Sequence, residues 1–187
     1  SVKKSLPKLD KHLKHFINLS PFLVLSTVRD DGFCDASPRG DAPGFVRILD
    51  DNNLFLPDRP GNNRLDSLCN IVENPNVGIL VLIPGFKECL RINGIAKVTN
   101  NGDLLARFEY QGKLPKSAIV VSIKEIYFHC AKAITRAKLW EVESLVSRSI
   151  MPSLGKILMA QIDPEKSQGE VKKVEELIES RVKTTLY

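Results

Sequence analysis

Aromatic side chains and long apolar runs are scarce in this sequence of 187 residues. Aromatics make up 6% of the chain, so the stacking platform that a single-stranded nucleic-acid site needs is not evident. The best apolar run, residues 77–83, has the length of a strand and cannot cross a bilayer. Residues 1–4 lack an apolar signal core. We therefore expect a soluble cytoplasmic protein with no membrane partner.

Clustered cysteines and the common nucleotide motifs are also absent. The four cysteines form no C-x-x-C pair and no framework of regular spacing, which disfavours both disulfides and a zinc site. Neither a G-x-G-x-x-G motif nor a Walker-type loop occurs. We expect reduced thiols, no metal, and a ligand held by some other arrangement. The cysteines are Cys34, Cys69, Cys89 and Cys130.

The formal net charge is +5, which raises the question of an anionic partner. Most of this excess, +4, lies in residues 1–20, whereas residues 21–159 carry +2 and residues 160–187 carry −1. A local basic run of this kind is usually a solvated helix face. Nucleic-acid binding by the basic N-terminus is therefore an alternative that the sequence disfavours.

Short apolar segments predict a mainly β protein with flanking helices. Strands dominate the middle of the chain, and the turns between them are short, which favours an antiparallel barrel, closed or partly closed. Gly94 lies inside a predicted strand, where a glycine indicates a bulge or a close backbone approach. The predicted strands are 22–28, 33–37, 45–49, 54–56, 77–83, 89–99 and 118–128, and the predicted helices are 9–17, 64–73, 103–110, 132–140 and 171–182.

This pattern divides the chain into three parts. Residues 1–20 form an N-terminal helix, residues 21–142 the barrel domain, and residues 143–187 a helical C-terminal extension. Pro152 and Gly155 interrupt the extension before its predicted helix.

The polar segment 58–65 lies between a predicted strand end and a predicted helix start. It offers Arg59, Asn62, Asn63 and Arg64, with Gly61 allowing a tight turn. Helix N-termini bind phosphate through free N–H groups, and arginine adds charge-assisted hydrogen bonds. The alternative is a helix capped by Asn63 with arginines on the surface.

A second polar segment, 36–47, is predicted to be a loop that could hold the edge of a planar ligand. Ser37 and Arg39, with Gly40 and Gly44, make it a polar loop between strands. The alternative is a long connection in which Arg39 pairs with Asp35 or Asp41.

The segment 128–140 carries a third group of basic residues. Lys132 and Arg136 stand four residues apart and share a helix face, with Trp140 one turn further along. Their like charges repel each other unless an anion lies between them. The alternative is a solvated helix edge with Trp140 in the core, and His129 is by default a structural residue.

Strand alternation places Arg91 on the same face as Asn93, opposite Leu90 and Ile92. This arrangement fits a polar strand face.

Taken together, these segments resemble the pyridoxamine-phosphate-oxidase-like FMN-binding split-barrel family, and most closely its branch of largely uncharacterised flavoproteins. The resemblance covers roughly residues 15–142 and rests on motifs that are specific only in combination. They are Asp35-Ala-Ser-Pro-Arg-Gly-Asp41, Pro43-Gly-Phe-Val46, Pro57-Asp-Arg-Pro-Gly-Asn-Asn-Arg64, Asn74-Pro75, Leu90-Arg-Ile-Asn-Gly94, and His129-Cys-Ala-Lys-Ala133 with Leu139-Trp140.

The resemblance implies a six-stranded antiparallel split barrel, a homodimer, and FMN in a groove between the two subunits. By position, the phosphate segment is Arg59, Asn62, Asn63 and Arg64, and the strand along the flavin is Phe45, Val46 and Arg47. The preceding loop is Arg39 and Gly40, and a strand position beside the cofactor is Arg91. Lys132, Arg136 and Trp140 match a later segment supplied by the partner subunit.

Two departures from the family pattern bear on function. The chain has no C-terminal Arg-Leu-x-Pro signature of the true oxidases, so oxidation of pyridoxamine phosphate is not implied. The segment after Trp140 has no counterpart in the resemblance.

The expected function is an FMN-dependent oxidoreductase acting on an unknown small molecule, with Arg39 and Lys132 placing positive charge near N1 and O2 of the flavin. The alternative is a non-catalytic flavin- or haem-binding carrier or sensor, in which His129 would be the axial haem ligand.

Overall fold

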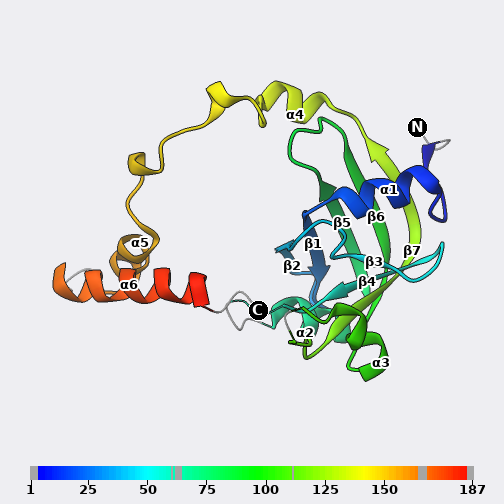
Figure 1. Ribbon diagram of the computed structural model, residues 1–187, viewed down its shortest axis with the longest axis horizontal. Helices are drawn as coiled ribbons and strands as arrows, with labels where there is room; N and C mark the ends of the chain where they lie inside the picture. The colour runs from blue at the N-terminus through cyan, green and yellow to red at the C-terminus, as the bar shows by residue number, and fades with distance from the viewer. Residues whose placement is uncertain (1–3, 60, 62–64, 111, 164–167, 185–187) are drawn as a thin grey trace. The chain divides into compact units, whose positions relative to one another are not determined.

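The computed structural model describes residues 4–59, 61, 65–110, 112–163 and 168–184 (Figure 1). The chain divides into two compact units. The first unit contains residues 1–58 and 63–140, and the second contains residues 59–62 and 141–187.

Seven antiparallel strands form one sheet in the first unit, in the order β2-β1-β5-β6-β7-β4-β3. Each strand falls on a segment that the apolar pattern predicts, so these seven predictions are confirmed. The strands are β1 (Phe22–Val28), β2 (Cys34–Gly40), β3 (Arg47–Ile48), β4 (Asn53–Pro57), β5 (Asn76–Leu82), β6 (Cys89–Thr99) and β7 (Ala118–His129).

The expectation of a six-stranded barrel is wrong in strand number and in closure. The sheet has seven strands, and its end strands β2 and β3 are not paired with each other in the described residues. Pro38 lies in β2 and has no N–H to donate, which suits a strand at the edge of a sheet. β3 is only two residues long, because Phe45 and Val46 turn into the core before it begins.

The main core lies on one face of this sheet and draws apolar side chains from β1, β4, β5, β6 and β7. Helix α1 (Lys11–Leu19) contributes Leu13, Phe16 and Ile17, which are buried against the strands. Asp10 caps this helix by accepting hydrogen bonds from the N–H groups of His12 and Leu13. The predicted amphipathic helix that ends before Ser20 is thereby confirmed.

Helix α2 (Asp66–Glu73) packs against β1, β2 and β6 and buries Ile71 in the same core. It begins after Leu65, and the predicted cap Asn63 lies outside the described residues.

A smaller core covers the opposite face of β4 and β7. The Phe55 and Phe108 rings contact each other at a tilt of 46°, with centroids 4.6 Å apart, and Leu105, Ala118 and Val120 complete the cluster. Leu105 and Phe108 come from helix α3 (Gly102–Leu105) and the 3-10 turn η2 (Ala106–Phe108). β4 is therefore buried on both faces.

Gly94 marks both a bulge and a close backbone approach, as its place in a strand suggested. The β6–β7 register shifts between Asn93 and Gly94, which leaves Lys124 without a partner in the ladder. A Cβ atom at position 94 would lie 2.5 Å from the Ser122 carbonyl oxygen. Only glycine fits at this close approach of the two strands without displacing the backbone.

The first unit ends with α4 (Lys132–Ala137), which is shorter than the predicted 132–140 helix. Lys138 adopts φ 51° and ends the helix in the left-handed conformation.

The second unit holds two longer helices, α5 (Leu154–Ile162) and α6 (Gln168–Thr184), after the 3-10 turns η3 (Val142–Ser144) and η4 (Arg148–Ile150). α6 extends beyond the predicted 171–182 helix, and α5 was not predicted. Gly155 allows α5 and α6 to pack closely, since a Cβ there would lie 3.2 Å from the Glu175 Cα. No helix in the described part of the chain is both long and apolar enough to cross a membrane.

Replacing Gly94 by alanine should destabilise the fold. The added Cβ meets backbone that cannot move independently, so we expect the free energy of unfolding to fall by roughly 1–3 kcal/mol. Gly78→Ala is the matched control, because its Cβ would make only ordinary contacts at 3.7 Å and 3.8 Å. Urea unfolding of both variants measures the difference, and equal midpoints would contradict the close approach.

Candidate functional site

Arg39 lies on β2 and is fixed at the end of β4 by a carboxylate. Its Nη1 donates to Asp58 Oδ1 at 3.3 Å, and Ser117 Oγ donates to Asp58 Oδ2 at 3.1 Å. The Arg39 and Asp58 side chains are 20% and 22% exposed. Arg39 Nε is buried and has no hydrogen-bond partner in the described part of the chain. The guanidinium is thus held in place, and Nε is a buried donor without a partner among the described residues.

The sequence prediction for this segment needs two corrections. Arg39 and Gly40 belong to a strand rather than a loop, and Gly40 pairs in register with Phe22. Arg39 forms an ion pair with Asp58, whereas the alternative to a ligand-holding loop named Asp35 or Asp41 as its partner. A Ser-Pro-Arg-Gly sequence looks like a turn, but pairing with β1 keeps it extended.

Helix α2 is attached to β1 and β2 through two polar contacts. Ser67 Oγ donates to Asp35 Oδ2 at 3.0 Å, and Asn70 Nδ2 donates to Thr27 Oγ1 at 2.9 Å. Ser67, Asn70 and Thr27 are buried. Such contacts are specific because a buried polar group left unpaired is costly. They fix the start of α2 relative to the strand that carries Arg39.

The predicted phosphate segment begins directly after Asp58. Arg59 is half-buried, whereas Asn62, Asn63 and Arg64 lie outside the described residues. Their role therefore stays a prediction.

Phe45, Val46 and Arg47 are placed differently from one another. Phe45 and Val46 are 8% and 3% exposed and belong to the core, whereas Arg47 is exposed and opens β3 opposite Phe55. Of the first two residues, only the backbone can contact a ligand.

Arg91 lies on the exposed face of β6, as predicted, and points to the same side of the strand as Asn93. Its guanidinium carbon lies 5.4 Å from the centre of the Tyr127 ring, a cation–π arrangement. Asn93 Nδ2 donates to Glu125 Oε2 at 2.8 Å, and Ser5 Oγ donates to Glu125 Oε1 at 2.9 Å. These hydrogen bonds, that of Asn93 first, lower the pKa of Glu125 below its ordinary value.

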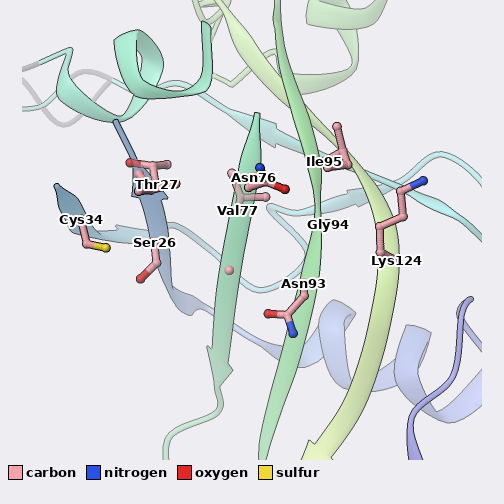
Figure 2. A pocket seen from close by; sticks show the side chains of 11 residues that line it. Ser26, Thr27, Cys34, Asn76, Val77, Asn93, Gly94, Ile95 and Lys124 are labelled. Carbon is pink, nitrogen blue, oxygen red and sulfur yellow. The ribbon is translucent and has the colours of Figure 1, made fainter. Parts of the chain in front are cut away.

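A hollow of about 420 Å³ lies on the same exposed face (Figure 2). Gly78 occupies its middle, between Ser26 of β1 and Asn93 of β6 in a continuous row of paired residues. Lys124, the bulged residue, also lines it. None of the predicted site residues that the structure describes lines this hollow. Its signal in the sequence is small or polar residues at the outward positions of neighbouring strands.

Lys132 and Arg136 are exposed on α4, but the helix ends before Trp140. Trp140 therefore does not continue their face, and it is not a core residue either. It is 37% exposed, and its indole Nε1 donates to the Phe86 carbonyl oxygen at 2.7 Å. His129 ends β7 opposite Cys89 and is half-buried.

The sheet register places two predicted site residues on opposite faces. Arg39 pairs with Leu23, which is buried in the core, whereas Arg91 pairs with Leu80, whose row points away from the core. A single chain thus presents Arg39 at the core side of the edge strand and Arg91 on the outer face.

The family model for pyridoxamine 5'-phosphate oxidase matches residues 9–130. The chain therefore belongs to the pyridoxamine 5'-phosphate oxidase family, which confirms the resemblance seen in its motifs. No curated protein gives a significant match to the chain.

Solved structures with this fold include two bacterial proteins. HupZ of Group A Streptococcus is 17% identical, with 64% of this chain and 93% of that chain covered and a TM-score of 0.53. A putative pyridoxamine 5'-phosphate oxidase of Lactobacillus delbrueckii is 20% identical, with 66% and 98% covered and a TM-score of 0.51. At these identities the likeness concerns the fold alone.

Glu125 should make the attachment of the N-terminal segment depend on pH. Leu6 and Ile126 exchange two backbone hydrogen bonds of 2.9 Å next to the Ser5–Glu125 contact. Because the pKa of Glu125 is lower in the folded protein, its stabilising contribution is present above its ordinary pKa of 4.5 and is lost as the pH falls through the folded value.

Hydrogen exchange of the Leu6 amide measures this contribution as a protection factor. We expect Glu125→Gln to lower the protection at pH 7 severalfold and to have less effect in acid. Glu73→Gln, at the exposed end of α2, is the control. Equal protection in both variants at pH 7 would show that Glu125 does not hold the segment.

Proposed function

We propose that this protein binds FMN and acts as a flavin-dependent oxidoreductase on a small molecule. The observation that carries the proposal is Arg39, a fixed guanidinium with a buried and unpartnered Nε, on the residue that matches the family's cofactor loop. A buried donor without an acceptor is costly. An acceptor group of a bound ligand, such as a carbonyl of the flavin ring, would remove that cost.

The residues around Arg39 suit a cofactor that carries a phosphate. Asp58 orients the guanidinium and immediately precedes the segment 59–64, which matches the family's phosphate-binding segment. Arginine and main-chain N–H groups suit a phosphate dianion. When bound, FMN would supply the redox chemistry. The task of the chain is then to hold the phosphate, orient the ring and exclude water from one of its faces.

We further propose a homodimer with the cofactor groove between its subunits. The placement of Arg39 and Arg91 on opposite faces supports this, since two copies could bring both faces to one ligand. β5 adds support, because two of its outward residues, Leu80 and Leu82, are apolar like its inward ones. Strands that are apolar on both faces are typical of sheets covered on both sides. Lys132, Arg136 and Trp140 would reach the groove from the partner.

Binding of FMN is tested directly by the absorbance spectrum of the purified protein, with and without added FMN. We expect a flavin spectrum, and Arg64→Ala should abolish retention of the cofactor while leaving the fold intact. Arg29→Ala is the control, since Arg29 is an exposed arginine paired with Asp31. A colourless protein that takes up no FMN would overturn the proposal, and equal flavin content in the two variants would overturn the phosphate assignment.

Arg39→Lys tests the guanidinium itself. Lysine keeps the charge beside Asp58 but lacks Nε and the planar fork. A hydrogen bond to a charged group contributes about 1.5–3 kcal/mol, so we expect FMN to bind roughly ten- to a hundredfold more weakly. Arg29→Lys is the matched control. Titration by flavin fluorescence gives both dissociation constants, and unchanged affinity in Arg39→Lys would remove Arg39 from the site.

A further inference from the structure

The segment from residue 142 to residue 162, here called the arm, exposes apolar side chains over its whole length. Eight large apolar residues in it are between 36% and 75% exposed. Single exposed apolar residues need no explanation, but a concentration of them in one short segment indicates an interaction surface. The eight are Val142, Leu145, Val146, Ile150, Met151, Leu154, Leu158 and Ile162.

Part of this surface is a stripe along α5. Leu154, Leu158 and Ile162 are spaced four residues apart and so lie on one side of the helix. Gly155 and Met159 are buried, and Gly155 packs against Glu175 of α6. α5 therefore has one side against α6 and another, apolar side that remains exposed among the described residues of the second unit.

The charges of the second unit limit what this surface can bind. Residues 141–187 hold seven basic and eight acidic side chains, which is a net charge of −1. This balance gives no attraction to nucleic acid or to an anionic membrane. Within residues 142–162 only Glu143, Arg148 and Lys156 are charged. Depletion of charge around apolar side chains is typical of the centre of a protein–protein interface.

We propose that the arm docks on a second copy of this chain and holds the two copies together. At roughly 100 Å² each, eight such side chains offer on the order of 800 Å², which is what each partner contributes to a standard interface. In a twofold dimer the same contact forms twice, so each arm would cover the other copy. This inference rests on the homodimer of the proposed function, and not on FMN binding.

A photo-crosslinking amino acid at position 146 of the full chain tests where the arm docks. Illumination should give a covalent product of twice the chain mass on a denaturing gel. Position 72 is the matched control, because Val72 on α2 is 76% exposed and Val146 is 75% exposed. Products of single-chain mass alone would mean that the arm folds on its own barrel, and this would overturn the proposal.

The energetic contribution of the arm is tested by Val142→Ser with Val146→Ser. Both side chains are exposed, so the fold should persist. Sedimentation equilibrium should show a dimer dissociation constant at least tenfold higher than that of the wild type, and Val72→Ser should leave it unchanged. Equal constants for the arm variant and the Val72 variant, or flotation of the protein with neutral phosphatidylcholine vesicles in place of self-association, would overturn the proposal.

The absorbance spectrum distinguishes this failure from that of the proposed function. If the protein is a yellow dimer whose arm forms no intermolecular crosslink, the proposal of FMN binding stands and the proposal of the arm contact fails. If the protein is a colourless dimer that does crosslink through position 146, the proposal of the arm contact stands and the proposal of FMN binding fails.

Discussion

The pairing of β6 with β7 is the constraint on which the rest of the first unit depends. These are the two longest strands, and they join the β2-β1-β5 side of the sheet to the β4-β3 side. Gly94 lets the two strands approach each other closely where the register shifts. The bulge also bends the sheet, because an extra residue on one strand increases the local twist. The bend allows strands from both sides to share one core. It also turns Lys124 out of the ladder and into the outer hollow.

The strands could be predicted from the sequence because their apolar residues alternate or form short runs. Arg39 could not be placed, because its strand depends on pairing with β1 and its partner Asp58 lies 19 residues away. Arg91 could be assigned to its face from the sequence, because alternation within a single strand is enough to show which residues share a face. The Arg39–Asp58 contact needs the relative position of two strands, which local sequence does not contain.

Helix α5 was missed for a related reason. Pro152 and Gly155 are ordinarily helix breakers, but Pro152 precedes the helix and Ser153 caps it by accepting from the N–H of Lys156. Gly155 is inside the helix, where it permits contact with α6. Tertiary packing therefore offsets the low helix propensity of glycine. The early end of α4 could not be predicted from the sequence either, because nothing in Lys138 itself indicates a left-handed conformation.

The two faces of the sheet differ in how completely side chains fill the space on them. Apart from Arg39 at its edge, the inner face is filled mainly by close-packed apolar side chains, so substitutions of those side chains change stability before they change binding. On the outer face, the row Ala36, Ser26, Gly78 and Asn93 carries small or short side chains. These leave the backbone near the surface, and the hollow exists because they fill little space (Figure 2). A flat ligand or the surface of a second copy can therefore approach the sheet closely along this row, whereas the neighbouring row, with Leu80, Arg91 and Tyr127, would contact it through its side chains.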